Sequence, residues 1–152
     1  MTDLPPHVAA NRQAWDAKAD QYVARGEEAW ARSEPVWGAW CIPNADLPLL
    51  PGDLSGLHAI ELGCGTAYGS AWMARRGARV TGVDNSAAQL ATARRLQREH
   101  GLEFPLVHGN AESLPQLADA SFDFVLSEYG ASIWADPFAW IPEAHRLLRP
   151  GG

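Results

Sequence analysis

The stretch AIELGCGTAYG, residues 59–69, decides the fold of this chain. Its first half is a short apolar run typical of a buried strand, and its second half is a glycine-rich turn that opens a segment able to form a helix. Gly63 and Gly65 lack a Cβ atom, which lets the backbone turn sharply and lets a ligand approach it closely. A glycine turn between a strand and a helix is the sequence context of a nucleotide-binding site.

Strands and helices alternate outward from this turn. The pattern predicts strands at 78–84, 104–109 and 121–128, and helices at 67–76, 86–101 and 137–148, the last interrupted by a proline. Strand–helix alternation at this spacing implies parallel pairing through right-handed crossovers. The expected fold class is therefore α/β, with a mostly parallel sheet between helices.

The front of the chain has a different texture. Residues 7–24 are predicted to form a helix on which Trp15, Ala19 and Tyr22 share one face, and a tryptophan-rich section and a turn-rich connector follow. We expect a helical, tryptophan-rich cap region over 1–56 and a ligand-binding core over 57–152. Docking on the core and covering a ligand are both open interpretations of the shared face.

Composition limits the function classes. The chain has 152 residues, a formal charge of −6 and no basic stretch, which argues mildly against a nucleic-acid partner. Cys41 and Cys64 have no metal-ligand spacing, so we expect no metal site and no disulfide framework, and a cytoplasmic location. No apolar run approaches the roughly 20 residues that span a bilayer, so no membrane partner is expected.

Two acidic residues indicate which cofactor the turn serves. Asp84 ends the second strand, where a carboxylate can accept both hydroxyls of an adenosine ribose. A dinucleotide site wants a third glycine where Tyr68 stands, and a P-loop lysine is absent. Glu61, two positions before Gly63, suits an ammonium and a sulfonium and would repel a pyrophosphate. The pattern favours S-adenosylmethionine over NAD.

Four segments in order carry a family resemblance. They are ELGCGTA (61–67), GNAESLP (109–115), FDFVLS (122–127) and RLLRPGG (146–152). Over roughly residues 58–152 the chain resembles the class I S-adenosylmethionine-dependent methyltransferases of the small-molecule type. The resemblance implies a Rossmann-like, three-layer α/β/α fold, S-adenosylmethionine as cofactor and a small-molecule methyl acceptor.

The resemblance also implies site residues. The turn would hold the methionine part of the cofactor, Asp84 the ribose, and Asn110 with Ala111 the adenine. Tyr22 would face the sulfonium with its ring. The full set of cofactor-binding residues expected on this basis is Tyr22, Glu61, Gly63, Cys64, Gly65, Asp84, Asn85, Asn110, Ala111, Glu112 and Ser127. No catalytic residue is assigned, because a general base is needed only for an acceptor that is protonated at working pH.

The chain departs from the family pattern at three places. Ala67 stands at the last glycine of the first motif, and Asn110 replaces the usual aspartate. The sequence stops at Gly152, where relatives continue into a fifth strand and a final antiparallel pair. The expectation is a partial core without these C-terminal strands, whose fourth strand forms an exposed edge.

Two functions from different classes follow. The first is an enzyme that methylates a small acceptor, and the second is a non-catalytic methyltransferase-like binding module that needs a partner or its missing C-terminus. A nicotinamide-dependent oxidoreductase is a distant third, disfavoured by Glu61 and Tyr68. Glu128 and Tyr129, just after the fourth strand, admit either a catalytic or a packing role.

Overall fold

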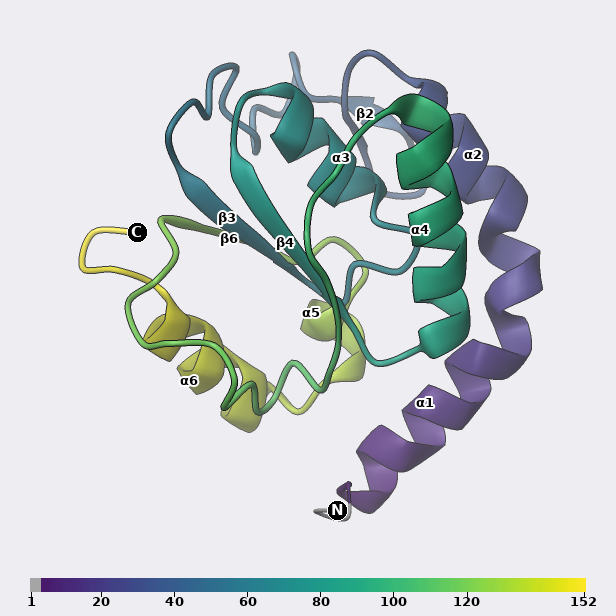
Figure 1. Cartoon of the computed structure of the whole chain (residues 1–152), viewed down its shortest axis with the longest axis vertical. Coiled ribbons are helices and arrows are strands. Elements are labelled where there is room, and N and C mark those ends of the chain that lie inside the picture. Colours follow the sequence, from purple (N-terminus) through teal and green to yellow (C-terminus); the bar gives the residue numbers. More distant parts are fainter. Residues whose placement is uncertain (1–3) are drawn as a thin grey trace.

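A computed structural model describes residues 4–152 as three layers, with a sheet between two sets of helices (Figure 1). The sheet contains β3 (His58–Leu62), β4 (Arg79–Asp84), β5 (Leu106–His108) and β6 (Phe124–Leu126) in the order β5-β4-β3-β6. Every pairing is parallel. The predicted α/β fold with a Rossmann-like parallel sheet is confirmed.

The strand register brings the functional loops to one edge. Leu62 pairs with Val83, and Glu61 pairs with Leu126, so β3, β4 and β6 end side by side. Loops that follow the carboxyl ends of parallel strands meet at the same edge of a sheet, which is where such folds bind ligands. Within residues 4–152, β5 and β6 are the two edge strands.

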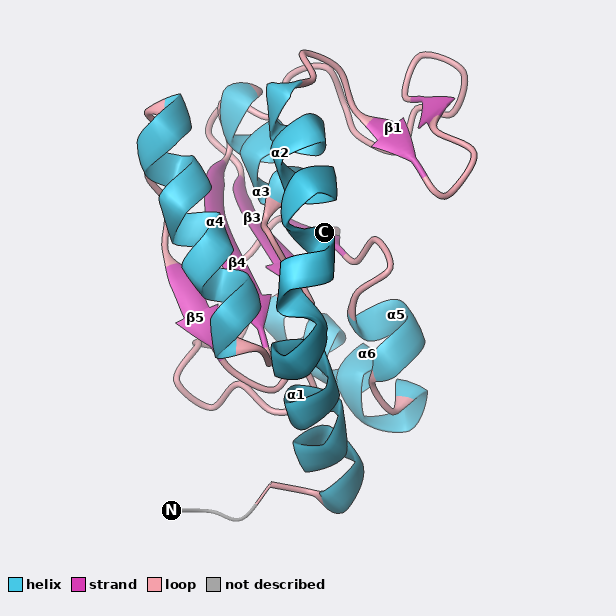
Figure 2. Ribbon diagram, turned by 90° about the vertical axis from the view of Figure 1, so that its right-hand side faces the viewer, coloured by secondary structure: helices cyan, strands magenta, loops and turns pink. Residues whose placement is uncertain are grey.

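Helices cover both faces of the sheet (Figure 2). On one side lie α2 (Val23–Ala31), α3 (Tyr68–Arg75) and α4 (Ala87–His100), with α1 (Pro6–Lys18) packed along α4. On the other side lie α5 (Ala131–Trp134) and α6 (Pro137–Leu147). Ser86 caps α4 by accepting a hydrogen bond from Gln89 N, as its position before the helix predicts.

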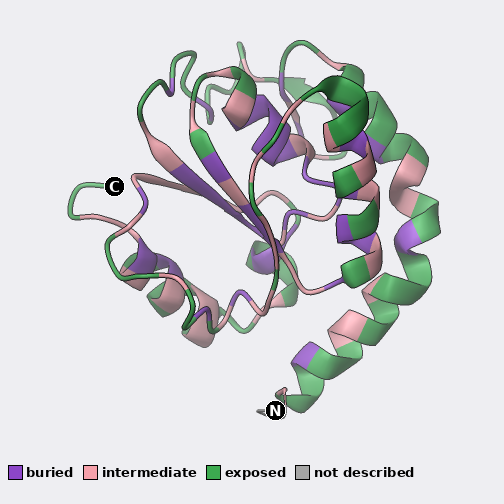
Figure 3. Ribbon diagram, in the orientation of Figure 1, coloured by how far each residue is buried: buried purple, intermediate pink, exposed green. Residues whose placement is uncertain are grey.

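Most residues of β3 and β4 are buried or half-buried (Figure 3). One apolar cluster joins Ile60 and Leu62 to Leu147 of α6, and another joins Ala59 and Val80 to α3. These strands read as continuous apolar runs because a parallel sheet covered on both faces buries both sets of side chains.

Several predicted boundaries were wrong. The expected helix 7–24 is not one α-helix: α1 ends at Lys18, a 3-10 helix spans Ala19–Tyr22, and α2 then continues. The expected helix start at Ala67 is also wrong, because Ala67 takes a left-handed backbone with φ 62° and α3 begins at Tyr68. Pro142 does not break α6, since its missing N–H costs one hydrogen bond in a helix that is held by packing.

Two elements had no sequence prediction. A small antiparallel hairpin pairs β1 (Val36–Trp37) with β2 (Ile42–Pro43) inside the tryptophan-rich section, and α5 is a single helical turn after β6. The division into 1–56 and 57–152 stays a prediction. No helix within residues 4–152 is long and apolar enough to cross a membrane.

Candidate functional site

A cavity of about 370 Å³ opens where β3, β4 and β6 end. This volume lies within the range of small-molecule sites, roughly 300–1,000 Å³. Nine of the eleven residues expected to bind the cofactor line its wall: Tyr22, Gly63, Cys64, Gly65, Asp84, Asn85, Asn110, Ala111 and Glu112. Glu61 and Ser127 do not.

Asp84 links the ends of two strands. Its Oδ2 accepts a 2.7 Å hydrogen bond from Gly65 N, and its Oδ1 accepts a 2.8 Å bond from Ser86 N. Burial raises the pKa of Asp84, while these two backbone donors oppose the shift. Each carboxylate oxygen still has a lone pair for a ligand hydroxyl, because a carboxylate offers about four acceptor positions.

Glu61 lies beneath the glycine turn and not in the cavity. Its Oε2 accepts hydrogen bonds of 2.6 Å from both the N and the Oγ of Ser70, which faces it from α3. Full burial raises the pKa of Glu61 to about 8, so the side chain is mainly protonated at neutral pH. The sequence predicted a direct contact between Glu61 and the cofactor, but the side chain does not line the cavity and bonds to Ser70 instead.

Ser127 is also turned away from the cavity. Its Oγ donates to Leu62 O at 2.8 Å and accepts from Ser132 N at 3.0 Å. These bonds join the end of β3 to the start of α5, so the side chain braces the loop after β6.

Asn110 and Glu112 form one local network. Asn110 Oδ1 accepts from Glu112 N at 3.1 Å, and Glu112 Oε1 contacts His7 Nε2 at 2.8 Å and accepts from Asp136 N at 2.9 Å. The amide oxygen that the sequence assigns to the adenine is thus already engaged by the backbone. A ligand bond to it would use its second lone pair.

Helix α1 bridges the mouth of the cavity. Asp16 Oδ1 accepts from Ser86 Oγ at 2.6 Å on the β4 side, and Asn11 Nδ2 donates to Trp134 O at 2.7 Å on the β6 side. The Trp15 ring packs edge-on against both Tyr22 (5.1 Å between ring centroids) and Trp134 (5.2 Å). Trp15 and Tyr22 thus come together, although the single helix on which the prediction placed them ends at Lys18, and both residues line the cavity.

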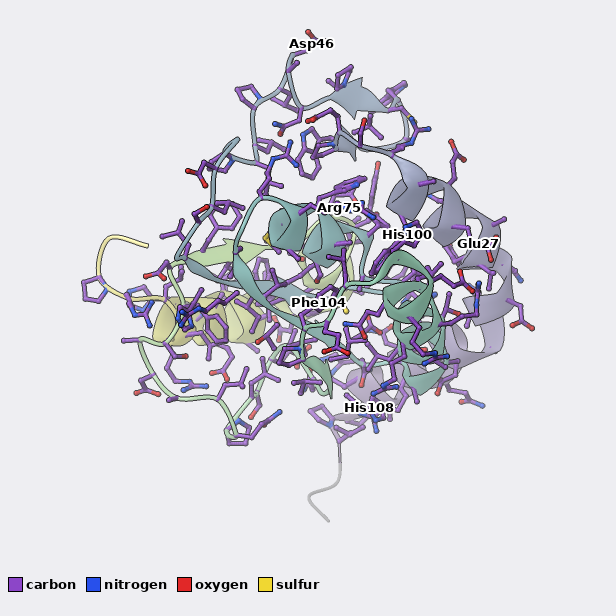
Figure 4. The ribbon with its side chains drawn as sticks, turned by 45° about the horizontal axis from the view of Figure 1, so that its top comes forward. Glu27, Asp46, Arg75, His100, Phe104 and His108 are labelled. Carbon is purple, nitrogen blue, oxygen red and sulfur yellow. The ribbon has the colours of Figure 1, made fainter. Side chains whose placement is uncertain are left out.

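Trp30 positions the glycine turn from behind. Its ring is fully buried, and its Nε1 donates to Thr66 O at 2.8 Å. Arg75, His100 and Phe104, labelled in Figure 4, surround this ring, with the Arg75 guanidinium 5.7 Å from the ring centroid. Part of the tryptophan-rich front section thus supports the turn itself.

Gln89 was missed by sequence reasoning. It lines the cavity, is 4% exposed, and its Oε1 is buried without a hydrogen-bond partner. A Cβ on Gly65 would lie 3.8 Å from that oxygen, so the amide sits close to the turn. The helical period could have placed Gln89 on the buried face of α4, because it stands four residues before Ala93 and seven before Leu96. Its missing partner is visible only in the structure, and an unpaired buried acceptor marks a place for a donor.

The wall of the cavity suits a cationic ligand. Asp84, Glu112 and Glu128 line it, with Arg25 as the one basic lining residue among those described. Aromatic rings also line it, and a ring face attracts a cation. A sulfonium, an ammonium and two ribose hydroxyls therefore match the donor and acceptor groups that the cavity presents. No cluster of three or more His, Cys, Asp or Glu able to hold a metal occurs in residues 4–152.

Comparison with known proteins identifies the family. A model described as "Methyltransferase domain" matches residues 60–152, which include the glycine turn, Asp84 and the chain end. Together with the fold, this match shows that the chain belongs to the S-adenosylmethionine-dependent class I methyltransferases. The family resemblance stated from the sequence is confirmed.

Two curated relatives of the chain carry the same name. A ubiquinone biosynthesis O-methyltransferase of Maricaulis maris is 40% identical over 97 residues, covering 64% of this chain and 38% of the relative. The protein of the same name from Ruegeria pomeroyi is 39% identical over 98 residues, covering 64% and 39%. This chain therefore spans about two fifths of the length of the curated relatives it matches.

Solved structures extend the likeness to the front section. The 4+2 cyclase SpnF superposes on 99% of this chain and 60% of its own, with a TM-score of 0.78 and 25% identity. An S-adenosylmethionine-dependent methyltransferase from Mesorhizobium loti covers 70% of this chain and 48% of its own, with a TM-score of 0.57 and 30% identity.

Proposed function

We propose that this chain forms the cofactor-binding part of an enzyme that transfers the methyl group of S-adenosylmethionine to an oxygen atom of a small molecule. One observation carries the proposal: the Asp84 carboxylate, tied to Gly65 N, faces a cavity whose wall is acidic and aromatic. That combination matches a cationic adenosine cofactor and opposes a pyrophosphate.

Named residues would hold the cofactor. Asp84 would accept the ribose hydroxyls through its free lone pairs, and Gln89 Oε1 would accept from a donor near the turn. Trp15 and Tyr22 would offer ring surfaces to the sulfonium. When bound, S-adenosylmethionine supplies an electrophilic methyl group, so the protein's task is alignment and the exclusion of water.

The choice of an oxygen acceptor rests on the relatives, which are named O-methyltransferases at 39–40% identity. No nucleic-acid contact is proposed, because the chain carries a net charge of −6. A cytoplasmic location is proposed on the two free cysteines, Cys41 and Cys64.

The test is calorimetric titration of the chain with S-adenosylhomocysteine. We expect binding by the wild type and at least about a tenfold loss of affinity in Asp84→Ala, because charge-assisted hydrogen bonds are removed. Asp46→Ala, an exposed change at a residue that does not line the cavity (labelled in Figure 4), is the matched control and should bind as the wild type does. A folded wild type that does not bind contradicts the proposal.

A second candidate is a methyltransferase-like binding module that pairs with another chain. It is favoured by β6, which forms an edge of the sheet within the described residues and carries backbone groups open to strand addition. Light scattering discriminates the two. A monomer that binds S-adenosylhomocysteine supports the enzyme, whereas concentration-dependent association that a co-expressed partner abolishes supports the module.

A further inference from the structure

One end of the cavity carries a hydrogen-bonded pair that the cofactor-binding residues do not use. The Tyr68 hydroxyl donates to Glu128 Oε2, and Gly38 N donates to Glu128 Oε1 at 3.1 Å. Tyr68 opens α3, Glu128 follows β6, and Gly38 lies in the β1–β2 hairpin, so three distant segments converge on one carboxylate. Tyr68 and Glu128 both line the cavity.

Glu128 lies on the opposite side of β3 from Asp84. β4, which ends at Asp84, pairs with one side of β3, and β6, which ends two residues before Glu128, pairs with the other. The loop after β6 touches the glycine turn, since a Cβ on Gly130 would lie 2.3 Å from Gly63 O. The cavity therefore has a ribose side and a Glu128 side, joined by the turn.

The pair leaves the carboxylate free to accept a further hydrogen. Each oxygen of Glu128 accepts one protein hydrogen bond, whereas a carboxylate oxygen offers two lone pairs. Burial and the charge of Glu128 raise the pKa of Tyr68, so the phenol stays protonated and donates. Between the two groups, the carboxylate is the one that can take a proton.

The charged and titratable groups around Glu128 come from several elements. Arg25 of α2 lines the same cavity, and Glu28 and Arg32 share with Glu128 a second hollow of about 60 Å³. Glu61 lies below in β3 and is mainly protonated at neutral pH. Glu128 itself accepts one hydrogen bond from Tyr68 and one from Gly38 N, which fixes the carboxylate at this end of the cavity.

We propose that Glu128 is the general base of the reaction, and that Tyr68 is the residue that positions it. The inference rests on the proposed function and specifies its acceptor as a neutral phenolic or enolic hydroxyl, which must lose a proton to react. A carboxylic acid, already ionised, would be repelled by the acidic wall.

In the proposed step, transfer of the acceptor's proton to Glu128 is coupled to displacement at the methyl carbon. The O–H bond of the acceptor breaks and its proton passes to a free lone pair of the Glu128 carboxylate. The acceptor oxygen forms a bond to the methyl carbon, and the carbon–sulfur bond breaks with its electron pair on sulfur. The products are a methyl ether and S-adenosylhomocysteine, and Glu128 then releases the proton to water.

The test uses 4-nitrocatechol, a phenol whose ionised form absorbs at longer wavelength than its neutral form. The probe is titrated with pH while bound to the full chain saturated with S-adenosylhomocysteine. An adjacent carboxylate disfavours a phenolate, so the wild type should keep the bound probe neutral to a pH at least about one unit higher than Glu128→Gln does. Glu128→Gln keeps an oxygen for Gly38 N, and Glu128→Asp, which keeps the charge, should recover part of the shift.

Methyl transfer to the same probe gives a second readout. We expect Glu128→Gln to lower kcat at least about 100-fold where the probe is neutral, and to recover rate as rising pH ionises the probe. Tyr68→Phe should cause a smaller loss and move the acid limb of the pH profile. Two controls separate other roles: Tyr129→Phe removes the hydroxyl that accepts from Ala39 N at 3.1 Å in the same hairpin, and Glu28→Gln removes a nearby charge.

The outcomes separate the assignment of Glu128 as the base from the proposed function on which it rests. Equal probe titrations and rates within about threefold in wild type and Glu128→Gln overturn the assignment of the base and leave the cofactor site standing. Equal losses in Tyr129→Phe and Glu128→Gln also overturn it, because anchoring of the hairpin would then explain both. A wild type that fails to bind S-adenosylhomocysteine overturns the proposed function, and this inference with it.

Discussion

The amide of Gly65 donates a 2.7 Å hydrogen bond to Oδ2 of Asp84, which couples the turn after β3 to the end of β4. The Asp84 carboxylate, which we propose binds the cofactor ribose, is therefore oriented by the backbone of the glycine turn. A charged acceptor held by a backbone donor is worth more than a neutral pair, about 1.5–3 kcal/mol. Geometry at the turn should consequently control both stability and binding.

The two turn glycines should respond differently to alanine. Gly63 has φ 76°, and a Cβ there would lie 2.5 Å from Ala131 N, so Gly63→Ala combines backbone strain with a clash against the loop after β6. Gly65 has φ 54°, and its Cβ would meet only Gln89 Oε1 at 3.8 Å, so Gly65→Ala costs the strain alone, about 1–2 kcal/mol. Thermal unfolding should show a much larger loss for Gly63→Ala.

Ligand affinity should be sensitive to Gly65→Ala even though this variant is only mildly destabilised. The Gly65 Cβ would enter the cavity, so Gly65→Ala should stay folded while its affinity for S-adenosylhomocysteine falls at least about tenfold. Equal destabilisation of the two variants, or unchanged affinity in Gly65→Ala, would refute this account of the turn.

The sheet and the general place of the site were predictable because they follow from local patterns. Residues 59–69 and Asp84 lie at strand ends, and the carboxyl ends of parallel strands converge whatever the loops do. The positions of Glu61 and Ser127 were not predictable. A glutamate side chain is normally exposed. Its burial here depends on two hydrogen bonds from Ser70 of α3, and nothing in the sequence pattern of that helix indicates that Ser70 faces Glu61.

The hairpin and α5 escaped prediction for a different reason. Each is too short to show a period of 2 or 3.6, and both are held by tertiary contacts such as Gly38 N to Glu128 and Ser132 N to Ser127. Gln89 differs, because the helical period indicates its buried face, but the lack of a partner for its Oε1 depends on tertiary neighbours. The Glu128 side of the cavity, built from three distant segments, is thus visible only in three dimensions.

Glu61 should make stability fall as pH rises. Its pKa is about 8 in the folded chain and about 4.5 when unfolded, so between these values the folded state binds more protons. The contribution of Glu61 to the free energy of unfolding is therefore fully present below pH 4.5 and declines toward pH 8, by up to roughly 1.4 kcal/mol per pH unit. Glu61→Gln removes this titration and keeps an acceptor for Ser70.

Melting curves of the two proteins across this pH range provide the measurement. The variant's Tm should approach or exceed that of the wild type as the pH is raised from 5 to 8, whereas a constant difference would show that Glu61 does not change its protonation on unfolding. Comparing the difference between the proteins cancels the titration of groups that do not interact with Glu61.

Gly26 should be required for the close approach of α2 to the glycine turn. A Cβ at Gly26 would lie 2.7 Å from Thr66 Oγ1, so Gly26→Ala forces the helix away from the turn and should lower stability by about 1–3 kcal/mol. Gly52→Ala is the matched control, because a Cβ there meets nothing within 4 Å. Denaturant unfolding should separate them, and similar midpoints would argue against tight packing at Thr66.

Replacing the Gln89 amide should raise the stability of the free protein and weaken its binding of S-adenosylhomocysteine. Its buried Oε1 has no partner, which costs the free protein about 1–3 kcal/mol, and Gln89→Met removes the polar group at nearly equal volume. The variant without ligand should melt higher than the wild type while binding S-adenosylhomocysteine more weakly. A variant that is both less stable and equally tight in binding would mean that the oxygen is satisfied in solution and faces no ligand.

Asp16 should control the docking of α1 over the cavity. Its Oδ1 accepts from Ser86 Oγ at 2.6 Å and from Ala88 N at 3.2 Å, and the Ser86 bond holds the pKa of Asp16 below its usual value. Asp16→Ala should loosen the docking of α1 without unfolding the sheet, because the core clusters around the sheet lie elsewhere. Hydrogen exchange should then speed up over residues 6–18 and remain slow in β3 and β4. S-adenosylhomocysteine should bind several-fold more weakly as Trp15 leaves the cavity wall.

Asp20→Ala, an exposed change in the neighbouring 3-10 helix, is the control. If both variants exchange alike, the two hydrogen bonds of Asp16 add nothing to the docking of α1, which its other hydrogen bonds and its aromatic contacts then hold.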